Sequence, residues 1–225
     1  ENDKPYTAPV KVAILTAWGK LRTWGYVGHF IEGMELYEVT ESLAGLPVDV
    51  EYISFEDILE NGVPDDVQVI LNAGRMGSAW SGGEYWKNDK VIEALSAWVA
   101  DGGGFIGIGE PSAYDYSSQY FQLSHILGLD RQKLQNYANP KRQYQITDSK
   151  HFILEDAHGE IDFGCDIDNI VVAGKNAQVL AEENNSPQIA THQFDKGRAI
   201  YLSGFKFNPA NSRLLLRSLF WAAGK

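Results

Sequence analysis

Short apolar runs alternate with amphipathic helical patterns along the first half of the chain, and this alternation restricts the fold more than any other feature. The runs are Val12–Leu15, Val48–Ile53, Val67–Leu71 and Phe105–Ile108. Continuous apolar runs of this length, rich in β-branched residues, are typical of parallel strands buried on both faces. The order therefore predicts an α/β fold, an open and mainly parallel sheet with helices on both faces.

Local signals mark where the intervening helices begin and end. A 3.6-residue apolar period runs from Met34 to Leu43 and again from Val91 to Val99. Ser54 followed by Asp57 resembles a capping box at a helix start. The glycines of Asp101–Gly104 can take the left-handed conformation that ends a helix, and they lead directly into the fourth strand.

The second half of the chain has a different pattern. Short candidate strands cover Ile167–Val172 and Gln178–Glu182. Gln188–Gln193 then faces Arg198–Ser203 across a short polar turn, which predicts an antiparallel hairpin near the C-terminus. A closing helix over Asn211–Ala223 presents an apolar face to the sheet.

Composition excludes several classes of partner. The chain carries 19 basic and 30 acidic residues, a net charge of −11, so it repels polyanions and we expect no nucleic-acid partner. No apolar run approaches the roughly 18 residues of a membrane span. The single cysteine, Cys165, cannot form an internal disulfide, and we expect a soluble, cytoplasmic protein without a membrane partner.

No linker or low-complexity tract divides the sequence. We therefore expect one domain over residues 1–225, in which residues 1–9 are a polar linker. The chain opens on Glu1 and stops shortly after its last apolar helix, which favours a fragment of a larger multidomain enzyme.

Three loops follow strands on the edge of the sheet where ligands bind in such folds. The first loop, after the first strand, carries Trp18, Lys20, Arg22 and Trp24. Indole faces beside charged donors are typical of sugar sites, so these four residues are candidates for contact with substrate. Packing of both tryptophans on the sheet edge or on a neighbouring domain is the simpler interpretation.

The second loop, Asn72–Trp86, is rich in glycine and aromatic residues and contains Arg75, another substrate-proximal candidate. Its backbone could hold an anion, but it lacks the Gly-Lys-Ser/Thr ending of a phosphate-binding loop. A packed loop with aromatic anchors is the favoured interpretation.

The third loop, Gly107–Tyr114, is a strand followed by a tight turn, where related folds hold a catalytic nucleophile. Glu110 or Gly109 stands at that place, with no cysteine, and Ser112 lies past the turn outside a Gly-x-Ser-x-Gly motif. Cys165 lies far along the chain. We therefore predict no catalytic residue here and keep Glu110 only as a substrate-proximal candidate.

Metal and cofactor sites are not predicted. The five histidines show no ligand spacing. A group of acidic side chains lacks the regular spacing of a calcium loop and is typical of a solvated face; its members are Glu155, Asp156, Glu160, Asp162, Asp166 and Asp168.

Several separated segments, in order along nearly the whole chain, are similar to one known family. They are Ala17–Arg22, Leu46–Val50 with Ile53–Phe55, Phe105–Gly107 with Gly109–Pro111, and Asn211–Leu215. The sequence resembles the central domain of the lacto-N-biose/galacto-N-biose phosphorylases, glycoside hydrolase family 112. The resemblance implies a class I glutamine amidotransferase-like (flavodoxin-like) fold.

The same resemblance implies a parent enzyme with an N-terminal barrel, this domain and C-terminal domains. Such an enzyme converts β-1,3-galactosyl-N-acetylhexosamine plus phosphate to α-galactose 1-phosphate and N-acetylhexosamine, with inversion; some relatives act on galactosyl-rhamnose. The family's catalytic acid lies in the barrel, so this chain alone is expected to be inactive. Its expected roles are packing against the barrel and subunit association, including a homodimer.

Two alternatives stay open at this point. A stand-alone amidotransferase-like or trehalose-utilisation-type carbohydrate enzyme would use Glu110 with His29 or His125. A carbohydrate-binding module would use Trp residues of the first two loops, among them Trp80 and Trp86.

Overall fold

A seven-stranded sheet in the order β2-β1-β3-β4-β9-β8-β7 forms the centre of the computed structural model. The structure describes residues 6–17, 35–78, 80–114, 119–132, 150–156, 161–164, 167 and 169–225. Five strands run parallel, namely β2 (Asp49–Ser54), β1 (Lys11–Thr16), β3 (Val69–Gly74), β4 (Gly104–Gly109) and β9 (Gly197–Leu202). Strand β8 (Ser186–Phe194) is antiparallel to both β9 and β7 (Gln178–Glu183).

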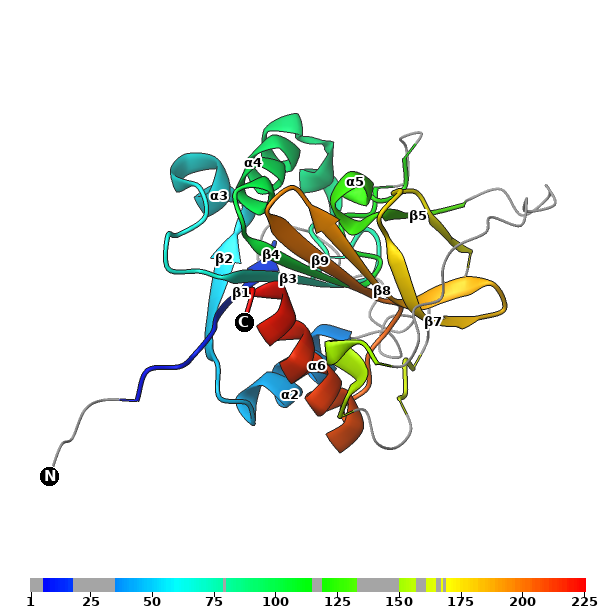
Figure 1. Ribbon diagram of the computed structural model, residues 1–225. Coiled ribbons are helices and arrows are strands. Elements are labelled where there is room, and N and C mark those ends of the chain that lie inside the picture. The colour runs from blue at the N-terminus through cyan, green and yellow to red at the C-terminus, as the bar shows by residue number, and fades with distance from the viewer. Residues whose placement is uncertain are drawn as a thin grey trace, which may run out of the picture.

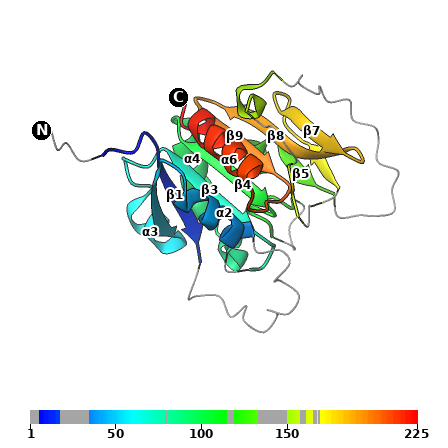
Figure 2. The same cartoon turned by 90° about the horizontal axis from the view of Figure 1, so that it is seen from below.

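Helices cover both faces of this sheet (Figure 1). One face carries α3 (Phe55–Asn61), α4 (Asp89–Ala100) and α5 (Ser124–Leu127). The other carries α2 (Glu35–Ala44) and α6 (Pro209–Ala222), which lie in front of the strands in Figure 2. Each layer buries its own apolar cluster against the sheet. The predicted fold class, an open and mainly parallel sheet with helices on both faces, is confirmed.

The two central strands explain the continuous apolar runs in the sequence. Every residue of β3 and of β4 is buried, because helices pack on both faces and strands pair on both sides. Apart from Asn72, whose amide group bonds to Ser81 and Ser112, these strands carry no polar side chains, and charged side chains lie in the loops beyond the strand ends.

The predicted start and stop signals are present. The Ser54 hydroxyl accepts a hydrogen bond from the Asp57 N–H, and the Asp57 carboxylate accepts one from the Ser54 N–H, which completes the capping box of α3. Asn88 caps α4. The chain leaves α4 through Asp101 and Gly102, whose φ of 123° requires glycine.

The hairpin near the C-terminus is also confirmed, with Gln193 opposite Arg198. One pairing was not predicted: β5 (Leu129–Arg131) and β6 (Ile170–Val172) form a separate two-stranded antiparallel sheet. Strand β6 lies within the predicted strand Ile167–Val172, whereas β5 has only three residues and is too short to show a period. Two 3-10 helices, Gly83–Lys87 and Phe152–Leu154, complete the described elements. Across the described residues, no helix has the length and apolarity needed to span a membrane.

Gly197 is the first residue of β9 and packs closely on the end of α4. A substitution at this position tests that packing. A Cβ at Gly197 would lie 2.0 Å from the Val99 carbonyl oxygen and 2.5 Å from that of Gly103. We expect Gly197→Ala to lower the free energy of unfolding by about 2–3 kcal/mol, measured by urea denaturation, because backbone atoms would have to move. Gly45→Ala is the control, since its Cβ would meet only the Ser42 carbonyl oxygen at 3.7 Å. Equal effects of the two substitutions would contradict this packing.

Candidate functional site

The turn at the end of β4 carries no side chain at its sharpest point. Gly109, the last residue of β4, has a φ of 78°, which glycine adopts without strain. The next residue, Glu110, donates its N–H to the Gly74 carbonyl oxygen at 2.9 Å. In hydrolases built on this type of turn, the nucleophile occupies the sharp position and the following N–H helps to form the oxyanion hole. In this chain the sharp position is Gly109, which has no nucleophilic side chain. The N–H that follows it, that of Glu110, is already bonded to Gly74.

Ser112 lies farther along the same turn and is completely buried. Its φ of 56° is unusual for a residue with a side chain, and two bonds hold it in place. The Ser112 N–H donates to the Asn72 amide oxygen, and the Ser112 hydroxyl accepts from the Leu123 N–H, both at 3.1 Å. The hydroxyl therefore ties the turn to neighbouring segments and is inaccessible to a substrate.

The Glu110 side chain points into the protein and is held by three donors. One carboxylate oxygen accepts from the Met76 N–H at 2.9 Å. The other accepts from the Tyr120 hydroxyl at 2.5 Å and forms an ion pair with Arg131. Burial, reinforced by the Glu110 carboxylate, raises the pKa of Tyr120 above its usual range, so its hydroxyl stays protonated and donates to Glu110.

A second carboxylate lies against the same turn. Glu35, at the start of α2, has a side chain only 3% exposed and forms an ion pair of 2.9 Å with Arg75. Its carboxyl group packs near Gly109, because a Cβ at Gly109 would lie 3.5 Å from it. Burial raises the pKa of Glu35 to about 7, although the nearby Arg75 guanidinium opposes the shift. No described residue bonds its second oxygen, Oε2.

The structure brings two of the predicted site residues to one place. Arg75 follows β3 and Glu110 follows β4, so both lie at the carboxyl edge of the central strands. The other candidates, Trp18, Lys20, Arg22 and Trp24, lie outside the described residues. Their contact with substrate stays a prediction.

Three residues that lie around Gly109 and Glu110 were not predicted from the sequence: Glu35, Tyr120 and Arg131. Only Glu35 gave a usable signal, since a carboxylate between Met34 and Leu36 interrupts an apolar helical pattern, and buried carboxylates need partners. Tyr120 and Arg131 approach Glu110 only through tertiary folding.

The loop after β3 is a packed connection, as its aromatic residues suggested. Trp86 is completely buried and packs edge-on against Phe55, with ring centroids 5.1 Å apart. The hydroxyls of Ser78 and Ser81 donate to the Arg75 carbonyl oxygen at 2.6 and 2.5 Å. The proposal that Trp86 binds carbohydrate is therefore wrong, because no face of its ring is available.

Among the described histidines, none bonds Glu110. His125 lies within 2.8 Å of the Ser96 hydroxyl of α4 and packs against Phe194. His29, the other suggested partner of Glu110, lies outside the described residues. Over the same part of the chain, no three His, Cys, Asp or Glu side chains are grouped to hold a metal ion. Of the acidic group noted in the sequence, Glu155 and Asp156 pair with Arg217.

The sequence matches one protein family over most of its length. Residues 11–225 match the family model described as "Lacto-N-biose phosphorylase central domain". The chain is 42% identical over 229 residues to a 1,3-β-galactosyl-N-acetylhexosamine phosphorylase of Lachnoclostridium phytofermentans, an alignment that covers 99% of the chain and 31% of the relative.

Two further relatives have related names. A D-galactosyl-β-1→4-L-rhamnose phosphorylase of the same organism is 36% identical, with 99% of the chain and 30% of the relative aligned. A 1,3-β-galactosyl-N-acetylhexosamine phosphorylase of Bifidobacterium longum is 34% identical, with 95% of the chain and 33% of the relative aligned. The chain thus spans about a third of the length of these relatives.

Solved structures share the fold at low sequence identity. A β-galactosidase from Bacillus circulans sp. alkalophilus superposes with a TM-score of 0.59 at 18% identity, covering 96% of this chain and 31% of that one. A protein described as ThuA-like from Parabacteroides merdae superposes with a TM-score of 0.56 at 15% identity, covering 96% and 91%.

The raised pKa of Glu35 predicts a pH dependence of stability. Between pH 4.5 and about 7 the folded state keeps a proton that the unfolded state releases, so this contribution to stability is present below pH 4.5 and is lost as the pH rises to about 7. It amounts to about 3 kcal/mol at most. Among the described residues, the charged groups that act on Glu35 are Arg75, Glu110 and Lys206.

Glu35→Gln should remove this dependence. We expect the unfolding free energy of the variant, minus that of the parent chain, to increase steadily from pH 4.5 to 7.5 in urea titrations. Loss of the Arg75 partner shifts the whole difference by a constant and leaves its slope unchanged. A difference independent of pH would show that Glu35 titrates normally.

A substitution of Glu110 tests the importance of its ion pair with Arg131. We expect Glu110→Ala to lower the unfolding free energy by about 3 kcal/mol, because Arg131 and the Tyr120 hydroxyl lose their buried acceptor. In calorimetry this corresponds to a melting temperature lower by about 6–12 °C. Glu84→Ala, in an exposed pair with Lys87, is the control and should change stability by less than about 0.5 kcal/mol. A melting temperature unchanged in both variants would contradict the assigned role of Glu110.

Proposed function

We propose that this chain, which belongs to the lacto-N-biose phosphorylase central-domain family, is a non-catalytic architectural domain of a larger galactoside phosphorylase. The observation that carries the proposal is the turn at Gly109, which presents no side chain and whose following N–H is bonded to Gly74. The place where related folds keep their nucleophile is thus used to hold the chain together.

The carboxylates of the turn support the same proposal. Inverting phosphorolysis needs one carboxylic acid that protonates the leaving oxygen, while phosphate acts as the nucleophile. Glu110 is engaged by three donors, the Met76 N–H, the Tyr120 hydroxyl and the Arg131 guanidinium. Glu35 has the raised pKa that a general acid requires, but its side chain is 3% exposed and paired with Arg75, so a glycosidic oxygen cannot reach its proton.

The complete enzyme is part of the proposal. Because the aligned relatives are about three times as long as this chain, we propose that the chain forms one domain between an N-terminal barrel and C-terminal domains. Its roles would be barrel packing and subunit association in a cytoplasmic enzyme. By analogy with the name of the 42% identical relative, the parent would convert β-1,3-galactosyl-N-acetylhexosamine and phosphate to α-galactose 1-phosphate and N-acetylhexosamine.

An activity assay separates an architectural role from a catalytic one. We expect the 225-residue chain to release no galactose 1-phosphate from lacto-N-biose and phosphate. We expect a chimera, in which this chain replaces the matching segment of the 42% identical phosphorylase, to form the product.

Glu110→Gln in that chimera provides the decisive comparison. Loss of a catalytic acid typically lowers the rate by about 10²–10⁴-fold. We expect kcat to change by less than about tenfold and the melting temperature to fall, as for a structural residue. Turnover by the chain alone, or loss of kcat in a folded Glu110→Gln chimera, would overturn the proposal.

A further inference from the structure

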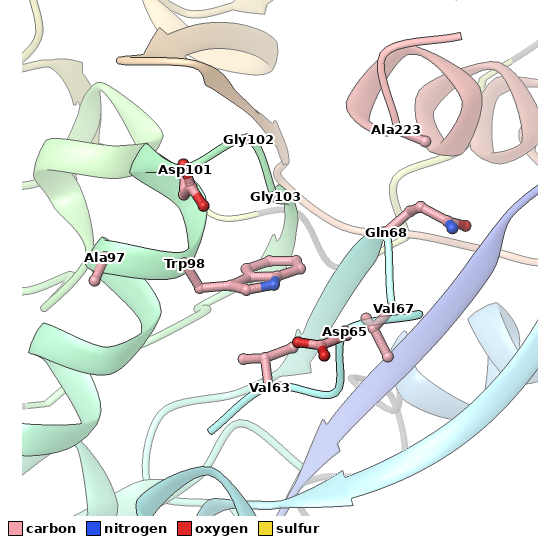
Figure 3. Close-up of a pocket in the computed structure, with 10 residues that line it drawn as sticks. All are labelled: Val63, Asp65, Val67, Gln68, Ala97, Trp98, Asp101, Gly102, Gly103 and Ala223. Atoms are coloured by element: carbon pink, nitrogen blue, oxygen red, sulfur yellow. The ribbon is translucent and has the colours of Figure 1, made fainter. Parts of the chain in front are cut away.

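An open pocket of about 450 Å³ lies at the edge of the sheet opposite the Gly109 turn. Gln68 immediately precedes β3 and Gly103 immediately precedes β4, so the pocket is at the amino-terminal ends of these strands. Figure 3 shows the indole of Trp98 crossing the pocket from α4, between Asp65 and Asp101. Its volume falls in the range of small-molecule sites.

The Trp98 ring is fixed in place by the backbone. A Cβ at Gly103 would lie 2.5 Å from the ring, so the indole packs directly on this glycine. Trp98 is partly buried and contacts the apolar cluster beneath α4. The pocket therefore has a rigid aromatic wall, and little side-chain entropy would be lost when a ligand packs on it.

The polar groups around Trp98 include both donors and acceptors without partners. Within the described part of the chain, the Trp98 indole N–H and the Gln68 side-chain NH₂ have no acceptor. The Gln68 side-chain oxygen accepts from the Lys11 N–H at 2.7 Å. The Asp65 carboxylate likewise has no donor among the described residues. Asp101 accepts from Lys196 through one oxygen, at 2.8 Å.

This mixture of groups selects one class of ligand. The two aspartates repel an anion, and a cation would face the N–H groups of Trp98 and Gln68. A hydrocarbon would leave the N–H groups of Trp98 and Gln68, which are only partly exposed, without partners. A hydroxyl group both donates and accepts, and the C–H face of a pyranose ring can pack on an indole.

We propose that this pocket binds the ring of a neutral monosaccharide, with Trp98 against the sugar face, Asp65 accepting from its hydroxyls and Gln68 donating to them. The site is separate from the Gly109 turn and does not depend on the architectural role of the domain. It uses a tryptophan outside the two loops that the sequence suggested for sugar contact.

The test uses the indole N–H resonance of Trp98, followed by NMR while methyl β-D-galactopyranoside or methyl β-D-glucopyranoside is added. Loss of one indole signal in Trp98→Phe assigns the resonance. We expect this signal to shift with a dissociation constant on the order of 1–10 mM, as for a small site of this kind. Asp65→Ala should weaken binding roughly tenfold, since a hydrogen bond to a charged group is lost.

Asp66→Ala is the matched control, because Asp66 adjoins Asp65 but pairs with Lys11 and does not line the pocket. It should leave the dissociation constant within about twofold, and the spectra themselves report whether each variant is folded. The proposal is overturned by an unshifted Trp98 signal at about 50 mM sugar, or by equal binding to the Asp65→Ala and parent chains. If ethylammonium chloride shifts the Trp98 signal and neither sugar does, the pocket is a cation site, and this result also overturns the proposal.

Discussion

The two central strands are buried along their whole length, and most of the remaining structure follows from this burial. Strands β3 and β4 have helices on both faces and neighbours on both sides. Apart from Asn72, the side chains of these strands are apolar, and charged side chains lie beyond the strand ends. A buried charge there needs a partner, because leaving it unpaired costs several kcal/mol, whereas an exposed carboxylate such as that of Asp65 is hydrated.

The two edges of the sheet meet this requirement differently. At the carboxyl edge the charges satisfy one another, as Glu110 pairs with Arg131 and Glu35 with Arg75. This mutual pairing, at the edge where a doubly wound sheet usually binds its ligand, supports the proposed architectural role. At the amino-terminal edge, Trp98 and Asp65 line an open pocket and retain polar groups without protein partners. A structural role is thus proposed for the carboxyl edge, and the capacity to bind a neutral ligand is proposed for the amino-terminal edge.

Much of the fold could be predicted because its signals are local. Apolar runs give the parallel strands, and the 3.6-residue period gives α4 and α6. The Ser54 capping box and the hairpin turn before Gly197 are properties of a few adjacent residues. The β6 strand was predicted but its pairing with β5 was not, since β5 has only three residues and the two strands lie far apart in the sequence.

By itself, the sequence determined the parallel strands, the main helices and the residue types at the turn after β4, because side-chain period and residue type are local properties. Tertiary structure alone decided that Gly109 is the sharp position and that Tyr120 and Arg131 meet Glu110. It also decided that Trp86 is buried, whereas Trp98 faces a pocket. The reason is physical: partners and burial depend on contacts between segments distant in the chain, and no local pattern encodes which segments will meet.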